Sequence, residues 1–232
     1  MELATFRFPE PELAGREGVV MGYAVRHPGG VLLFDTGFGF GDPELDATYH
    51  PRPRRIHDAL AEVGIHPDDV SAIVNCHLHV DHAGQNGAFP GVPIHVQPAE
   101  WDLAHTPDHT ILDWIEAPGT DYRRHPGDHQ IAPGLRVIAT PGHTAGHQSM
   151  LVDTTDGPVI LAGQACYTSG EWEHDPDALE GRSGAPDQPA YDASLDRLRG
   201  LRPVRVHFGH DRAAWHADPG RGPAPAILPG PC

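Results

Sequence analysis

The segment His77-Leu78-His79-Val80-Asp81-His82 places three imidazoles and one carboxylate within six residues. These side chains supply the nitrogen and oxygen donors that Zn²⁺ and similar ions prefer. On an extended backbone His77 and His79 point the same way, whereas Asp81 and His82 turn away as the segment ends. One short loop can therefore serve two adjacent metal ions. Because the chain contains 18 histidines, chance clustering is the alternative.

Two later segments repeat this placement of histidine beyond a strand. Residues 140–147, Thr-Pro-Gly-His-Thr-Ala-Gly-His, set His143 in a glycine-rich turn after an expected strand. Residues 207–211, His-Phe-Gly-His-Asp, do the same for His210 near the end of the chain. Both histidines are therefore candidates for the same kind of chemistry.

The first cluster follows a buried strand expected over residues 70–75, so it lies where open α/β sheets usually place ligands. An opening hairpin is expected from residues 19–25 and 31–35, which flank the turn His27-Pro28-Gly29-Gly30. Apolar residues at helical spacing predict a helix over residues 54–63. Further strands are predicted over residues 93–97, 135–140, 149–153, 159–162 and 204–208, and helices over 98–104 and 191–201. The chain is thus an α/β mixture, with 37–53 and 168–189 left as long loops.

Length and composition favour a single globular domain. The 232 residues can bury a large core, and we expect one domain over residues 1–216 and a flexible tail over 217–232. The net charge of −16 opposes attraction to nucleic acid or anionic lipid and suits a small, uncharged substrate. No apolar run approaches the roughly 18 residues of a spanning helix, and no export signal is evident. The odd set Cys76, Cys166 and Cys232 indicates free thiols, so we expect a soluble, cytoplasmic protein without membrane contacts.

Together the three histidine segments resemble the metallo-β-lactamase superfamily, from about Gly18 to Asp211. The likeness is greatest to the N-acyl homoserine lactonases, which are quorum-quenching hydrolases. It is carried by Leu33-Phe34-Asp35-Thr36-Gly37, His77-Leu78-His79-Val80-Asp81-His82-Ala83-Gly84, Thr140-Pro141-Gly142-His143, Gly146-His147-Gln148-Ser149 and Phe208-Gly209-His210-Asp211. Ala165-Cys166-Tyr167 also resembles the segment that carries the active-site tyrosine of that group.

The resemblance implies a four-layer αββα sandwich and two Zn²⁺ ions, although other divalent metals are alternatives. One ion would be held by His77, His79 and His143, and the other by Asp81, His82 and His210. Three protein ligands leave open positions on each ion, so a metal-bound hydroxide would be the nucleophile.

Gln164 departs from the family pattern. The family has a bridging aspartate in a Gly-Asp-Ala segment, whereas this chain reads Gly163-Gln164-Ala165. Gln164 can still offer its carbonyl oxygen, but one negative charge is lost and the second ion should be held more weakly.

The resemblance further implies that the hydroxide opens a lactone such as an N-acyl homoserine lactone. Tyr167 would donate a hydrogen bond to the developing oxyanion, with ordinary packing as its alternative. Asp81 would hold a metal and pass a proton to the leaving alkoxide, although ligation alone would explain it. Two other functions stay open: a thioesterase or glyoxalase II-like hydrolase on the same fold, and a catalytically altered biosynthetic or binding homologue.

Neighbouring residues have both functional and structural interpretations. Asp35 can orient a ligand histidine or form an Asx-turn, and His147 and Asp211 can act likewise behind the ligands. Cys76 and Cys166 are expected to be small buried residues. An apolar chain of a neutral substrate could be walled by Phe38, Phe40, Trp101 and Trp172, with core packing as the alternative for each. Surface positions are expected for His27, His50, His57, His105, His109, His125 and His129.

Overall fold

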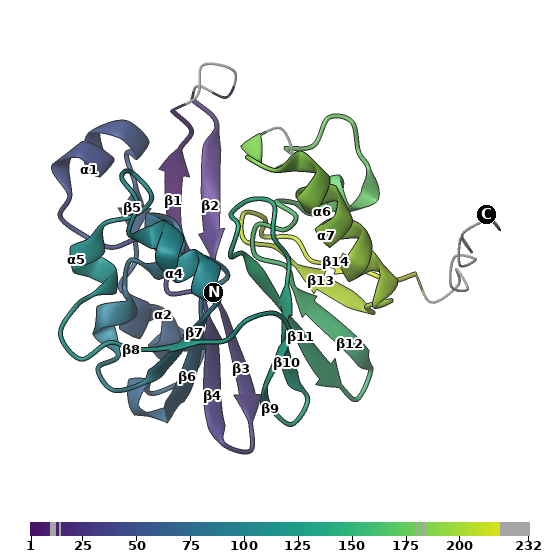
Figure 1. The fold of residues 1–232 in the computed structure, drawn as a ribbon, viewed down its shortest axis with the longest axis horizontal. Coiled ribbons are helices and arrows are strands. Elements are labelled where there is room, and N and C mark those ends of the chain that lie inside the picture. The colour runs from purple at the N-terminus through teal and green to yellow at the C-terminus, as the bar shows by residue number, and fades with distance from the viewer. Residues whose placement is uncertain (10–12, 14, 180, 182–183, 219–232) are drawn as a thin grey trace.

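Two β-sheets packed face to face form the centre of the protein, and helices cover the outer face of each sheet (Figure 1). The computed structural model describes residues 1–9, 13, 15–179, 181 and 184–218. Helices α2 (Ile56–Glu62), α4 (Pro98–Ala104) and α5 (Leu112–Ile115) lie on one side, and α6 (Ser169–Glu173) and α7 (Gln188–Gly200) on the other. The predicted αββα sandwich is confirmed.

In the described part of the chain, each half contributes one main sheet. The first has the order β3-β4-β6-β7-β8, comprising Tyr23–His27, Gly30–Phe34, Val70–Val74, Pro93–Val96 and Asp121–Arg124. The second has the order β14-β13-β12-β11-β10-β9, comprising Trp215–His216, Arg205–His207, Gly157–Leu161, Gln148–Thr154, Leu135–Ala139 and His129–Ala132. A small sheet of β2 (Glu17–Met21), β1 (Glu2–Arg7) and β5 (Arg52–Pro53) stands beside them.

Side chains along the buried strands point alternately to the opposite sheet and to the covering helices. On β4, Leu32 and Phe34 pack with Met150 of the opposite sheet, whereas Val31 and Leu33 pack with Leu60 of α2. Side chains on a strand point to opposite faces in turn, so a strand covered on both faces is apolar throughout. This accounts for the apolar run Val31–Phe34 of β4 and for the apolar residues of β6, in which Ser71 is the one polar residue and donates to the carbonyl of Val31.

Most predicted elements are confirmed with shifted ends, but the first one is wrong. Residues 19–25 do not form one strand: 19–21 belong to β2 of the small sheet, and β3 begins at Tyr23. Gly22 separates them, and a Cβ there would lie 2.4 Å from Cδ1 of Leu3. The chain changes sheets at this glycine, and the hairpin with β4 uses only Tyr23–His27.

The two predicted loops contain short elements. Residues 37–53 include α1 (Pro43–Tyr49), capped by Asp42, and residues 168–189 include α6, capped by Thr168. The predicted tail falls largely on residues 219–232, which lie outside the described residues. Among the described helices, each is too short or too polar to cross a bilayer.

Candidate metal centre

Four of the predicted metal ligands, His77, His79, His143 and His210, lie in loops that follow strands, at one edge of the two sheets. Asp81 and His82 lie on the short helix α3 (Val80–Ala83), which follows the loop of His77 and His79. His77 follows β6, His143 follows β10, and His210 follows β13. Backbone hydrogen bonds hold these loops together: the amide of Gln148 donates to the carbonyl of Cys76 at 2.8 Å across the sandwich, and that of Gly209 donates to Gly163 at 3.0 Å within the second sheet. Both sheets therefore fix the positions of the ligands.

Three imidazoles converge on a single point. Nε2 of His77 lies 2.9 Å from Nδ1 of His79 and 3.2 Å from Nε2 of His143, and the remaining pair is 3.3 Å apart. Their rings meet at 82°, 83° and 84°. Donors of a tetrahedral ion with Zn–N bonds of about 2.0–2.1 Å stand about 3.3 Å apart. The triangle therefore has the size that one such ion requires.

The electrostatics of this triangle favour a cation. Burial, followed by the neighbouring imidazoles, lowers the pKa of His77 and His143 well below the usual 6.5, and lowers that of His79 to about 4. The three rings are therefore neutral at pH 7, and the ligand nitrogens are the atoms that meet. A divalent ion uses these lone pairs without having to displace protons.

The second group of ligands is centred on a carboxylate. Oδ2 of Asp81 lies 3.1 Å from Nε2 of His82 and 3.6 Å from Nε2 of His210. Nδ1 of His210 donates to the carbonyl of Val19 at 2.7 Å, which leaves its Nε2 as the acceptor side of the ring. Burial opposes charge on His82, but Asp81, Cys76 and Asp35 together outweigh it and raise the pKa of His82. Nε2 of His82 is buried and makes no hydrogen bond to a described residue, as expected of an atom that faces a metal ion.

Gln164 gives an independent indication of an ion. Its Oε1 is buried and finds no hydrogen-bond partner among the described residues. An unsatisfied buried oxygen costs roughly 1–3 kcal/mol. Gln164 shares a cavity with Asp81 and His210, so its amide oxygen can serve as a neutral ligand. The nitrogen and oxygen donors of both groups therefore fit divalent metal ions.

Four of the predicted ligands, His79, Asp81, His143 and His210, line a cavity of about 640 Å³. Tyr167 lines the same cavity, with its ring 5.0 Å from that of His210 and 5.9 Å from that of His143. Apolar and aromatic side chains line much of the remainder, beside several polar and acidic ones; the apolar and aromatic side chains are Phe6, Phe8, Phe38, Leu45, Tyr49, Val80 and Ile111. The cavity thus joins a metal-binding end to an apolar end.

Comparison with known proteins fixes the family. The family model of the metallo-beta-lactamase superfamily matches residues 15–210. This chain belongs to the metallo-beta-lactamase superfamily.

Among curated relatives, an N-acyl homoserine lactonase of Bacillus sp. is 39% identical over 162 residues, which cover 68% of this chain and 62% of the relative. The chain thus spans less than two thirds of that relative's length. The N-acyl homoserine lactonase AttM of Rhizobium radiobacter is 31% identical over 229 residues, covering 83% of this chain and 82% of AttM.

A solved N-acyl homoserine lactone hydrolase, with N-hexanoyl-L-homoserine bound at its catalytic metal centre, is structurally similar. It is 29% identical, covers 90% of each chain and gives a TM-score of 0.75. The dizinc quorum-quenching lactonase AidC, at 20% identity and a TM-score of 0.62, shares the fold.

Behind the ligands of this metallo-beta-lactamase site, Asp35 is held in a strained conformation. Its φ of 65° lies in the left-handed region, which costs about 1–3 kcal/mol outside glycine. In this position Oδ1 accepts from the amide of Cys76 at 2.8 Å, and Oδ2 lies 2.9 Å from Nδ1 of His82. Of the two interpretations of Asp35, the contact that orients a ligand histidine is the one present.

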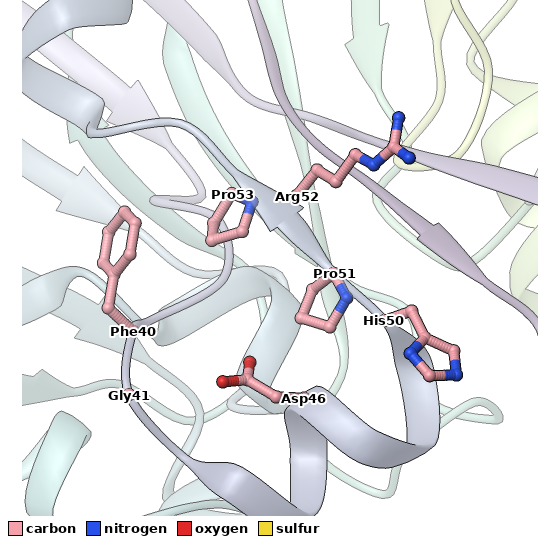
Figure 2. A pocket seen from close by; sticks show the side chains of 7 residues that line it. All are labelled: Phe40, Gly41, Asp46, His50, Pro51, Arg52 and Pro53. Atoms are coloured by element: carbon pink, nitrogen blue, oxygen red, sulfur yellow. The ribbon is translucent and has the colours of Figure 1, made fainter.

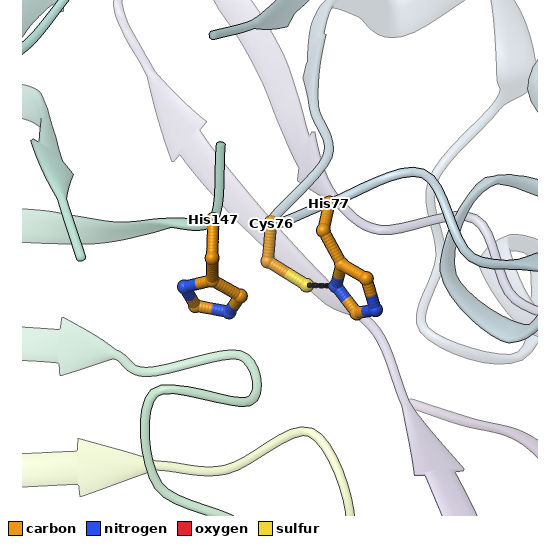
Figure 3. A group of neighbouring side chains, drawn as sticks. All are labelled: Cys76, His77 and His147. Atoms are coloured by element: carbon orange, nitrogen blue, oxygen red, sulfur yellow. Dashed lines mark hydrogen bonds between the residues drawn. The ribbon is translucent and has the colours of Figure 1, made fainter. Parts of the chain in front are cut away.

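Cys76 and His147 lie beside His77 (Figure 3). Sγ of Cys76 lies 3.0 Å from Nδ1 of His77, and burial raises the pKa of this thiol. Nε2 of His147 accepts from the amide of Gln164 at 2.9 Å. The thiol therefore supports a ligand ring, and His147 positions the loop that carries Gln164. Cys76 and Cys166 are free and buried, as predicted.

Glu100 and His109 form a part of the site that the sequence did not reveal. Oε1 of Glu100 accepts from the amide of Leu78 at 2.8 Å and lies 2.9 Å from Nε2 of His109, while Oε2 accepts from Thr144 at 2.5 Å. Glu100 therefore ties the loop of His77 and His79 to the loop of His143. Glycine at 146 permits this approach, because a Cβ there would lie 2.1 Å from the amide nitrogen of Glu100.

Several expectations about neighbouring residues are wrong. The side chain of His109 is only 7% exposed, because the buried carboxylate of Glu100 draws it inward. Its ring packs against that of His79 with the planes tilted by 51°. His125 and His129 are half-buried, as is His27, whereas His50, His57 and His105 are exposed as predicted. Asp211 accepts from Ser169 at the start of α6 instead of supporting a ligand.

The predicted apolar wall is also largely wrong. Of its four aromatic residues, only Phe38 lines the metal-site cavity. Trp101 packs on Tyr122, and Trp172 packs on Phe208 within the second-sheet core. Phe40 lines a separate cavity of about 470 Å³ between α1 and β5, beside Pro51 and Pro53 and away from the metal ligands (Figure 2).

Proposed function

We propose that this chain is a metal-dependent lactonase that opens N-acyl homoserine lactones. The observation that carries the proposal is the convergence of two predicted ligand sets beside one cavity: His77, His79 and His143, and then His82 and His210 around Asp81. The naming of two curated relatives as N-acyl homoserine lactonases supports the choice of substrate. A cytoplasmic location and a single domain over residues 1–216 are part of this proposal.

Each set would hold one divalent ion, most suitably Zn²⁺. When bound, the ions would polarise the lactone carbonyl and lower the pKa of a water molecule. The chain supplies the rest: Tyr167 donates a hydrogen bond to the carbonyl oxygen as it gains charge. Asp81 takes a proton from the attacking water and passes it to the departing ring oxygen. That Tyr167 and Asp81 line the same cavity supports a role for both side chains at a bound substrate.

The cavity suits a neutral substrate with an apolar chain. Phe6, Phe8, Phe38 and Ile111 offer apolar area beyond the metal ligands. Asp42, Glu44 and Asp108 are the charged groups that line it besides Asp81, and they disfavour an anionic substrate. These features support an acyl lactone over a substrate that carries a carboxylate.

Metal stoichiometry measured together with hydrolysis tests the proposal, for the native chain and for Gln164→Asp. Acyl homoserine lactones of several chain lengths would be compared with an acyl thioester. We expect the native chain to open the lactones in the presence of Zn²⁺ or Co²⁺. The aspartate variant should bind the second ion equally or more tightly, because it restores a negative charge beside Asp81. Weaker binding in the variant would assign Gln164 a positive role of its own.

Two outcomes would replace the proposal. Faster turnover of the thioester would favour a thioesterase or glyoxalase II-like enzyme. Fewer than one bound ion per chain, together with no hydrolysis after metal is added, would favour a binding or catalytically altered homologue. Gln164 in place of an aspartate is the observation that keeps this second candidate in view.

A further inference from the structure

A second group of three histidines lies away from the cavity, where the chain crosses between the two main sheets. His95 is on β7, His125 directly follows β8, and His129 opens β9. One ring nitrogen from each lies within 4.8 Å of one from each of the others. The first two residues belong to one sheet and the third to the other. The group therefore spans the junction of the sheets.

The crossover that carries two of these rings is fixed by hydrogen bonds. The side chain of Gln97 accepts from the amide of Gly127 at 2.8 Å and donates to its carbonyl at 2.9 Å. Asp128 accepts from the amide of Ala139 at 3.1 Å and from Arg197 at 2.6 Å. The backbone at residues 125–129 is thus held in place by both sheets, so the three imidazoles are brought together before any ligand binds.

One nitrogen in the group lacks a partner. Nδ1 of His95 is buried and makes no hydrogen bond to any described residue. His125 and His129 stack face to face, with centroids 3.8 Å apart and planes within 5°, and His95 lies at 20° to His125. Stacked rings share an ion only if one of them turns. The terminal torsion of histidine is broad, and His125 and His129 are half-buried, so this movement is small and inexpensive.

We propose that His95, His125 and His129 form a separate site for a divalent transition-metal ion, which clamps the two sheets at the crossover. An all-imidazole donor set selects Zn²⁺, Cu²⁺ or Ni²⁺ over Mg²⁺ or Ca²⁺. Three ligands leave the fourth tetrahedral position to water. This site shares no residue with the central one and does not depend on the proposed lactonase activity.

Equilibrium dialysis of the full chain against Zn²⁺ tests the site, with bound metal measured by plasma mass spectrometry. The native chain is compared with the double variant His125→Asn/His129→Asn. His57→Gln is the matched control, because His57 is exposed on α2 and belongs to neither cluster. We expect the native chain and the control to bind about one ion per chain more than the double variant. Equal stoichiometry in all three proteins would overturn the proposal.

A second measurement needs no variant. Crystals grown with Zn²⁺ should show an anomalous scattering peak between His95 and His129, beside the peaks at the central site. No peak there, at a zinc concentration that fills the central site, would also overturn it. In thermal unfolding, Zn²⁺ should raise the Tm of the native chain further than that of the double variant, because the ion binds the folded state alone.

Discussion

Two histidine clusters in one chain differ in the way their rings meet. In the central cluster the rings of His77, His79 and His143 stand nearly perpendicular and point at one centre. In the crossover cluster the rings of His125 and His129 lie parallel, with their faces in contact. Proximity alone therefore does not make a finished metal site. The central loops hold their rings in the ligating orientation, whereas the crossover must reorient one ring and should bind its ion more weakly.

The largest expected effect tests the finished site. His143→Ala removes one of three ligands, so we expect kcat/KM for lactone hydrolysis to fall by more than the 10–100-fold that loss of an outer-shell partner costs. Metal analysis should show loss of the ion held by this triangle. The same measurements on His57→Gln give the control. Equal activity of the two variants would break the contrast between a ligating histidine and a surface histidine.

A second effect separates chemistry from metal binding at the central cluster. Tyr167→Phe keeps the ring beside His210 and removes only the hydroxyl. We expect turnover to fall about 100-fold, as for the loss of one oxyanion donor, with unchanged metal content. Tyr122→Phe, a change to a tyrosine outside the cavity, is the comparison for effects on folding. Unaltered turnover in Tyr167→Phe would show that the hydroxyl of Tyr167 has no role in the reaction and that the ring serves only in packing.

A third effect concerns the support of the perpendicular rings. Glu100→Gln keeps the shape of the side chain but weakens its contacts with the Leu78 amide, Thr144 and His109. We expect the affinity for the first ion to fall about 10–100-fold, the range for partners behind the ligands. The exposed pair of Glu116 and His105 offers the matched control Glu116→Gln. Similar affinities in both variants would show that the ligand loops hold their geometry without Glu100.

The smallest effect comes from a histidine outside both clusters. Burial, then Arg205, lowers the pKa of His207 from 6.5 to about 4. The unfolded chain therefore binds this proton first, so His207 should reduce stability progressively as pH falls from about 6.5 to about 4. Urea unfolding of the metal-free chain and of His207→Asn across this window measures it. A parallel pH dependence of the two proteins would contradict the prediction.

The sequence predicted the central cluster well because spacing and strand ends determine it. A run such as His-Leu-His-Val-Asp-His encodes its ligand directions locally, and the sheet edge then brings in His143 and His210. The same reasoning failed where contacts are distant in sequence. His109 is drawn inward by Glu100, and no periodicity records that pairing. The prediction of the cavity lining failed for a related reason. Phe6 and Phe8 reach the site through the small sheet, and this sheet was not predicted.

The crossover cluster was missed for a third reason. His95, His125 and His129 span 34 positions and match no spacing motif. His125 and His129 were considered singly, as surface residues, and His95 was not singled out. Only the pairing of β7 with β8 and the turn into β9 bring them together. Element types could be predicted from local patterns, whereas the exchange of strands between sheets, as at Gly22, depends on packing that local patterns do not describe.

The central ligands come from widely separated parts of the chain, and this has a consequence for assembly. The contact between His77 and His143 closes a span of 66 residues, and the bond that orients His210 closes one of 191. The chain must lose conformational entropy to bring such distant residues together before the contact stabilises it. The ligand set is therefore complete only when both halves have docked, so metal capture should report the last step of folding. An ion added to the refolding chain should bind late and stabilise the docked halves. The rate of metal binding could be measured separately from the rate at which secondary structure forms.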